Sequence, residues 1–115
     1  MARSAAARLV GAAPLFAALG DPTRLRLVAR LCETGPLPIV RLAEAAPVSR
    51  QAITKHLRAL EAVGVVRSAR AGRQRIWEVE PRRLLEAQRA LDAIGAYWDA
   101  ALHRLRAIVE DDETR

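Results

Sequence analysis

The segment VSRQAITKHLRAL, residues 48–60, decides the fold of this 115-residue chain. Three of its apolar residues recur at steps of four and three, the spacing of one helix face: Ile53, Leu57 and Leu60. Ser49 precedes the pattern, and serine commonly caps a helix N-terminus with its side-chain oxygen. Gly64 follows it at the position where helices often end. The segment therefore predicts a capped helix with one buried face over about 50–63.

The remaining side chains of this helix point away from the core and suit DNA. Gln51 can bond adenine, Arg50 can bond guanine, and Thr54 can touch a thymine methyl group or a phosphate. Lys55 and Arg58 are expected to hold phosphates. Because an ordinary solvated helix face would be equally polar, the neighbouring elements must decide between the two interpretations.

A shorter helix is expected just before it, over about 39–46, with Leu42 and Ala45 facing the core. Pro47 and Val48 make a tight turn between the two helices. Two helices joined by a turn of three to four residues are typical of a helix-turn-helix motif. The end of the second helix must be well formed, because its first turns face the edge of a DNA groove.

A basic hairpin is expected directly after the second helix. Residues 65–70 and 75–79 suit two short strands around a glycine-containing turn at 71–74. Three arginines of this hairpin, a wing beside the helix-turn-helix, could reach a minor groove or the DNA backbone: Arg70, Arg73 and Arg75. The pattern of turn, cap and basic hairpin favours DNA binding.

Two further helices are expected upstream. Leu15, Phe16 and Leu19 suit a short helix that ends at Gly20. Asp21-Pro22 is a strong start for the next helix, since aspartate caps free amides and proline fits the first helical position. Leu27, Val28 and Leu31 share one face of that helix, and Gly35-Pro36 stops it. Residues 1–11 are expected to form a flexible arm.

A long last helix is predicted over about 81–109, followed by an acidic tail at 110–115. Its stripe has steps of four and three: Leu84, Gln88, Leu91, Gly95, Trp98, Leu102, Leu105 and Val109. That spacing is typical of helices that pack at a shallow angle. Because residues 12–109 form one small domain with little surface to cover this stripe, a homodimer is expected; the alternative is a helix that only caps its own domain.

The positive charge of the chain is local. The formal net charge is +6, and residues 50–75 contain seven basic and one acidic residue, a balance of +6. Residues 81–115 contain six basic and seven acidic residues, a balance of −1. A local basic surface indicates a polyanionic partner such as nucleic acid, although a solvated arginine-rich surface would give the same count.

Cysteine and hydropathy indicate a cytoplasmic protein without a membrane span. The single Cys32 cannot form a disulfide within the chain, and no apolar run approaches the ~20 residues that span a bilayer. Arg8 interrupts the apolar N-terminal stretch, so no secretory signal is expected. Cys32 is expected to be a small buried residue, with sulfenylation, a mixed disulfide or an intersubunit bond as alternatives. His56 is expected to hydrogen-bond within the fold, with a phosphate contact as the alternative.

These segments together resemble the ArsR family of bacterial regulators over about residues 12–80. The resemblance rests on four stretches: LFAALGDPTRLR (15–26), LAEA (42–45), VSRQAITKHLRAL (48–60) and GVV (64–66). It implies a winged helix-turn-helix homodimer, mainly α with a small β-hairpin in the order α-α-α-α-β-β-α, paired through its first and last helices. Leu15 and Phe16 of the first helix would then join Leu84, Leu91, Gly95, Trp98, Leu102 and Leu105 in the dimer interface. It also implies a pseudo-palindromic operator near the protein's own promoter and repression relieved by a signal.

The metal ligands of the family are not found here. Its Cys-x-Cys pair at the start of the third helix corresponds to Pro38 and Val40, which do not bind metals. Its Asp-x-His and His-x-x-Glu pairs on the last helix are broken at Ile94 and Arg106. Since zinc needs about four good ligands, neither a metal site nor any other cofactor is expected. The sequence identifies no inducer.

The sequence therefore predicts a transcriptional repressor that binds a double-stranded DNA operator as a homodimer. The alternative is a winged-helix module that binds another protein and has no specific DNA target. Steep salt dependence would distinguish them, because phosphate contacts weaken as salt rises. No enzyme is expected, since the chain contains no glycine-rich phosphate loop, nucleophile motif or convergent carboxylate pair.

Overall fold

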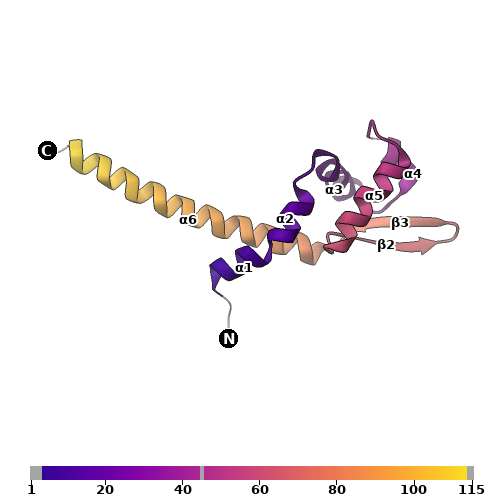
Figure 1. Cartoon of the computed structure of the whole chain (residues 1–115), viewed down its shortest axis with the longest axis horizontal. Coiled ribbons are helices and arrows are strands. Elements are labelled where there is room, and N and C mark those ends of the chain that lie inside the picture. The colour runs from indigo at the N-terminus through magenta and orange to yellow at the C-terminus, as the bar shows by residue number, and fades with distance from the viewer. Residues whose placement is uncertain (1–3, 45, 114–115) are drawn as a thin grey trace.

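The computed structural model describes residues 4–44 and 46–113. Figure 1 shows the helices α2–α5 and the strands gathered at one end of α6, which extends from them as a long rod. In chain order the elements are α1 (Ala5–Gly11), α2 (Ala13–Leu19), α3 (Pro22–Thr34), β1 (Leu37–Pro38), α4 (Ile39–Glu44), α5 (Arg50–Ala62), β2 (Val66–Ala71), β3 (Gln74–Val79) and α6 (Pro81–Glu113). The predicted fold class, helices with a small sheet in a winged helix-turn-helix, is confirmed.

The core lies where α2, α3, α4 and α5 meet the sheet. The apolar faces predicted for these helices are buried: Leu15, Leu27, Val28, Leu31, Leu42, Ile53, Leu57 and Leu60. Trp77 of β3 is the largest fully buried side chain and closes the core from the sheet side. Since burying one large apolar side chain contributes about 1.5–3 kcal/mol, this cluster is the main stabilising feature of the domain.

The predicted helix caps form as expected. The Asp21 carboxylate accepts a hydrogen bond from the Arg24 backbone N–H at 3.0 Å. The Ser49 hydroxyl accepts one from the Ala52 backbone N–H at 3.1 Å. Each bond satisfies an amide that the helix itself leaves without a partner, so α3 and α5 begin at defined residues.

The sheet has one strand more than the sequence predicts. Its order is β1-β3-β2, and both pairings are antiparallel. The additional strand pairs Leu37 with Trp77 and Pro38 with Ile76. A two-residue strand that contains a proline shows no alternation, so the sequence gives no signal for it. Gly72 has a φ of 64° in the turn between β2 and β3, a conformation that glycine adopts without strain.

Both ends of the chain are more helical than expected. Residues 5–11, predicted as a flexible arm, form α1; the Ser4 hydroxyl accepts from the Ala7 N–H at 3.1 Å, and the helix packs along α6. Alanine is the best helix former, which explains this correction. Helix α6 continues through the predicted acidic tail to Glu113, since no glycine or proline stops it. Residues 1–3 of the arm, Ala45 and residues 114–115 of the tail lie outside the described residues.

No helix of the described residues is long and apolar enough to cross a membrane. Helix α6 has sufficient length at 33 residues, but charged side chains recur along it.

Candidate nucleic-acid interface

The first turns of α5 present polar side chains to solvent. Arg50, Gln51 and Lys55 are exposed, whereas the neighbouring Ile53 is fully buried. Ser49 is also exposed, but its hydroxyl oxygen is already the cap acceptor of the helix. The N-terminal end of α5 therefore offers long, accessible donors at a rigid helix terminus, as groove recognition requires.

Thr54 lies between these residues and uses its hydroxyl internally. The Thr54 Oγ1 donates a hydrogen bond to the Arg50 carbonyl at 3.0 Å. A hydroxyl has only one proton to donate, so none is left for a phosphate while this bond holds. Of the two predicted roles of Thr54, contact with a thymine methyl group fits this arrangement better.

A cleft of about 230 Å³ separates the start of α5 from the wing. Its lining brings together three of the arginines and one glutamine from these two elements: Arg50, Arg73, Gln74 and Arg75. They lie far apart in the sequence, and the antiparallel β2–β3 pair returns the chain toward α5. Guanidinium groups grouped in this way produce a locally positive potential, which attracts phosphates.

Four of the cationic side chains predicted to contact DNA have no internal partner among the described residues. Within residues 4–44 and 46–113, no ion pair or side-chain hydrogen bond engages Arg50, Lys55, Arg70 or Arg73. Arg67 on the wing is different, because its guanidinium pairs with Glu78 at 2.7 Å and also with Glu80. The hydrogen bond that Arg67 donates to Glu78 is the main cause of the raised pKa of Arg67. The unpaired cations among the predicted DNA contacts thus lie on α5 and on the outer part of the wing.

Arg58 is engaged by side chains of its own domain, although the sequence predicts that it holds a phosphate. Its guanidinium donates to Glu61 at 2.8 Å and lies 5.3 Å from the ring centroid of Trp77. Ser68 of β2 donates to the other Glu61 oxygen at 3.2 Å, and Arg75 of β3 donates to Ser68 at 2.9 Å. We call Arg58, Glu61, Ser68 and Arg75 the α5–wing network. The bond from Arg58 is the main cause of the lowered pKa of Glu61.

The α5–wing network fixes the wing against α5. It links the third and fourth turns of α5 to both strands of the hairpin through three consecutive hydrogen bonds. This role of Glu61 and Ser68 was not predicted from the sequence. The i,i+3 spacing of Arg58 and Glu61 is a usable signal for the first link, whereas the link to Ser68 depends on the packing of β2 against α5.

His56 has the structural role that the sequence favours. Its Nδ1 accepts a hydrogen bond from the Arg24 Nε at 3.1 Å and lies 3.8 Å from the Asp21 carboxylate. Arg24 also donates to the Ala18 carbonyl at 3.3 Å. These contacts join α5 to the end of α2 and the start of α3. The Arg24 backbone N–H is the main cause of the lowered pKa of Asp21.

The residues predicted for a dimer interface divide into buried and exposed groups. Leu15 is fully buried in the core of its own chain, so it has no surface to offer a partner, which corrects the sequence expectation. Phe16 and Leu84 also pack partly against that core. Leu91, Trp98 and Leu105 are 56%, 64% and 56% exposed. Gly95 is exposed beside them, and Leu102 is half-buried.

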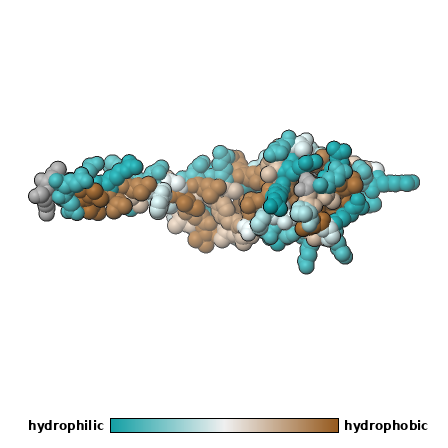
Figure 2. Space-filling model, turned by 90° about the horizontal axis from the view of Figure 1, so that it is seen from above, coloured by the Kyte–Doolittle hydropathy of each residue, from teal (hydrophilic) through white to brown (hydrophobic). Residues whose placement is uncertain are grey.

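An apolar band follows α6 away from the domain. Figure 2 shows brown surface continuing along the rod between teal side chains. Its exposed members include Ile94, Trp98 and Ile108. An uncovered apolar surface of this length is unusual for a monomer and marks an interaction surface.

Cys32 is exposed, which contradicts the expectation of a buried thiol. Leu27, Val28 and Leu31 set the buried face of α3, and Cys32 lies about 100° further round the helix than Leu31. Among the described residues, no group of three or more His, Cys, Asp or Glu side chains could hold a metal ion.

Comparisons with known proteins agree with this geometry. A helix-turn-helix domain model matches residues 19–69. The HTH-type transcriptional regulator Rv2034 of Mycobacterium tuberculosis is 34% identical over 95 residues, which cover 83% of this chain and 85% of the regulator. An ArsR-like transcriptional regulator from Rhodococcus sp. RHA1 has 40% identity and a TM-score of 0.69 over 89% of this chain and 92% of its own. The AntR antimony-specific transcriptional repressor has 30% identity and a TM-score of 0.55 over 74% of this chain and 78% of its own.

Proposed function

Because the chain belongs to the ArsR family of winged helix-turn-helix transcriptional regulators, we propose that it represses transcription as a homodimer on a pseudo-palindromic operator. The family consists of DNA-binding regulators and not of enzymes. The observation that carries the proposal is the cleft lined by Arg50, Arg73 and Arg75, with unpaired cations on both of its sides. In the cytoplasm of a bacterium, the polyanion that fits this surface is the chromosome.

In the proposed complex, the start of α5 enters the major groove. Arg50 and Gln51 then contact base edges, Lys55 holds a phosphate, and Ser49 keeps the helix end formed. Arg70 and Arg73 follow the backbone or the minor groove beside it. The guanidinium groups of Arg50, Arg70 and Arg73 have no partner within the described residues, which supports these roles.

The apolar band of α6 supports the homodimer. Two copies that pair along α6 would cover Leu91, Trp98 and Leu105, and a large aromatic side chain at the centre of an interface is a common anchor. Two-fold pairing displays α5 twice, so half-sites about one helical turn apart, ~34 Å, would match it. Such symmetry is the reason to expect a pseudo-palindromic operator.

The proposed repression has a simple physical basis. A dimer bound across a promoter excludes the polymerase from the same stretch of DNA. AntR, which has 30% identity to this chain, carries the description of a repressor, and this supports the direction of control. The proposed operator lies beside the gene of the protein itself.

An unbiased selection from random duplexes tests the proposal. We expect purified protein to enrich one motif with two inverted half-sites and to bind it with an affinity that falls steeply between low and moderate salt. A winged-helix module that binds only proteins would enrich no motif. Reporter expression from a promoter carrying the selected motif should fall when the protein is supplied, and a rise would contradict repression.

A further inference from the structure

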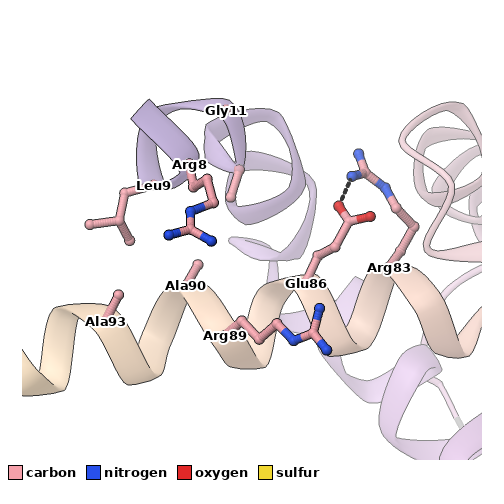
Figure 3. A pocket seen from close by; sticks show the side chains of 9 residues that line it. Arg8, Leu9, Gly11, Arg83, Glu86, Arg89, Ala90 and Ala93 are labelled. Atoms are coloured by element: carbon pink, nitrogen blue, oxygen red, sulfur yellow. Dashed lines mark hydrogen bonds and ion pairs between the residues drawn. The ribbon is translucent and has the colours of Figure 1, made fainter. Parts of the chain in front are cut away.

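A second cavity lies between α1 and α6, away from the start of α5 and the outer part of the wing (Figure 3). Its volume is about 510 Å³, within the ~300–1,000 Å³ that small-molecule sites occupy. Arg8 and Leu9 of α1 form one wall, and Arg89, Ala90 and Ala93 of α6 form the other. We call it the α1–α6 cavity.

The charges of the α1–α6 cavity favour an anion. Three arginines and one glutamate line it, which leaves two uncompensated positive charges. Arg83 is already engaged, because it pairs with Glu86 and donates to the Val63 carbonyl at 2.8 Å. In the part of the chain that the structure describes, the guanidinium groups of Arg8 and Arg89 have neither an ion pair nor a hydrogen bond.

Figure 3 shows how these groups lie. The guanidinium group of Arg8 reaches from α1 toward Ala90, and that of Arg89 extends along α6 below Glu86. The Glu86 carboxylate points toward Arg83 and not toward Arg8. A ligand carboxylate beside Arg8 would therefore meet a cation whose charge no neighbouring acid neutralises.

The rest of the lining is small and apolar. Ala90 and Ala93 leave space above α6, and Leu9 and Ala12 of the α1 segment face the same cavity. Such a surface gains free energy from covering an aliphatic group but offers few hydrogen-bond partners to a polar one. The ligand that fits both parts has a charged head and a short aliphatic body.

The cavity borders the surface proposed for dimerisation. At about 100° per residue, Ala90 lies roughly 40° round α6 from the exposed Ile94 of the apolar band, whereas Ala93 lies roughly 140° from Trp98. A partner that covers Leu91 and Trp98 would therefore lie beside the cavity, and the Ala93 side of the cavity faces away from Trp98.

We propose that the α1–α6 cavity binds an organic carboxylate with a short aliphatic body. The carboxylate pairs with Arg8 and Arg89, and the aliphatic chain lies over Ala90 and Ala93. Such a ligand bridges α1 and α6 and holds the shorter helix on the longer one.

Calorimetric titration of the full chain with sodium octanoate, without DNA, tests the proposal. We expect one saturable site per chain. The double variant Arg8→Gln/Arg89→Gln should bind octanoate at least tenfold more weakly. The variant Arg26→Gln/Arg104→Gln, which removes the same charge from exposed positions outside the cavity, should bind it as the wild type does. Ala93→Leu, which fills the cavity without changing its charge, should also weaken binding.

Two further probes test which chemical group of the ligand the cavity recognises. Octanol has the same aliphatic chain without the charge and should bind at least tenfold more weakly than octanoate. Equal binding would contradict the proposal that the ligand is an anion. Octyl phosphate should bind more weakly than octanoate, and tighter binding would contradict the proposal that the anionic group is a carboxylate. Absence of saturable octanoate binding, or equal binding by the Arg8→Gln/Arg89→Gln variant, would overturn the site itself. Because DNA is absent, each result is independent of the proposed operator binding.

Discussion

Arg50 and Gln51 are the two exposed side chains at the start of α5 to which base recognition is assigned. Removing either one should lower operator affinity by about 1–3 kcal/mol and broaden the preference for one base, because a bidentate base contact is lost. Arg50→Ala and Gln51→Ala are measured by fluorescence anisotropy on the selected duplex and on single-base variants of it. Arg104→Ala on the distal part of α6 is the control. Unchanged affinity and preference in both α5 variants would contradict the assignment.

Leu15 illustrates how one buried residue differs from an interface residue. It is fully buried in the domain core, whereas Leu91 is 56% exposed. Leu15→Ala should lower the free energy of unfolding by about 2–5 kcal/mol, because it leaves a cavity in the core. Leu91→Ala should change the stability of the domain much less and act on dimerisation instead. Urea denaturation at several protein concentrations distinguishes the two, and similar losses in both variants would contradict the burial of Leu15.

At the scale of elements, the α5–wing network connects α5 to the β2–β3 hairpin. Ser68→Ala removes the shared hydroxyl that joins Glu61 to Arg75. Because these groups are partly exposed, the loss of stability should be small, about 0–1 kcal/mol. The wing should nevertheless become less fixed relative to α5, so operator affinity should fall with little change in the melting temperature. Amide exchange of β2 and β3 checks this, and unchanged exchange and affinity would contradict the positioning role.

The carboxylate of Glu61 gives the same network a pH dependence. Its pKa is lowered from the ordinary value of 4.5, chiefly by the hydrogen bond from Arg58. A lowered folded-state pKa means that its contribution to stability is present above pH 4.5 and is lost as the pH falls through the folded pKa. Glu61→Gln should therefore have a shallower acid destabilisation below pH 4.5 than the wild type. Thermal unfolding from pH 6 to 3 measures the slopes, and identical slopes would contradict the effect.

At the scale of the whole molecule, α6 extends far from the domain (Figure 1), and the chain measures 73 Å along its longest axis. Trp98→Glu puts a charge into the exposed apolar band and should dissociate the proposed dimer, and weaken operator binding with it. Ala100→Glu adds the same charge on nearly the opposite side of the helix and is the matched control. Sedimentation velocity measures both; a dimeric Trp98→Glu protein would contradict pairing along this band.

The sequence by itself determined the elements whose signals are local. Ser49 and Asp21 marked helix starts because a cap depends on residues three positions apart, and the periodicity of Ile53, Leu57 and Leu60 marked a buried face because a helix repeats every 3.6 residues. The hairpin was predictable because its strands and its glycine-containing turn are also marked by residues close together in the sequence. The helix α1 was missed although Ser4 caps it, and the helical continuation to Glu113 was missed because no such marker stands there.

Only the tertiary structure decided which side chains remain available. Arg58 and Arg50 lie on the same helix and carry the same charge. Arg58 nevertheless contacts Glu61 and Trp77, whereas Arg50 lines an open cleft. Leu15 is buried although its pattern equally fits an interface, and Cys32 is exposed although free cysteines are usually buried. Such outcomes depend on contacts between segments distant in the chain, and periodicity within one segment contains no information about its partners.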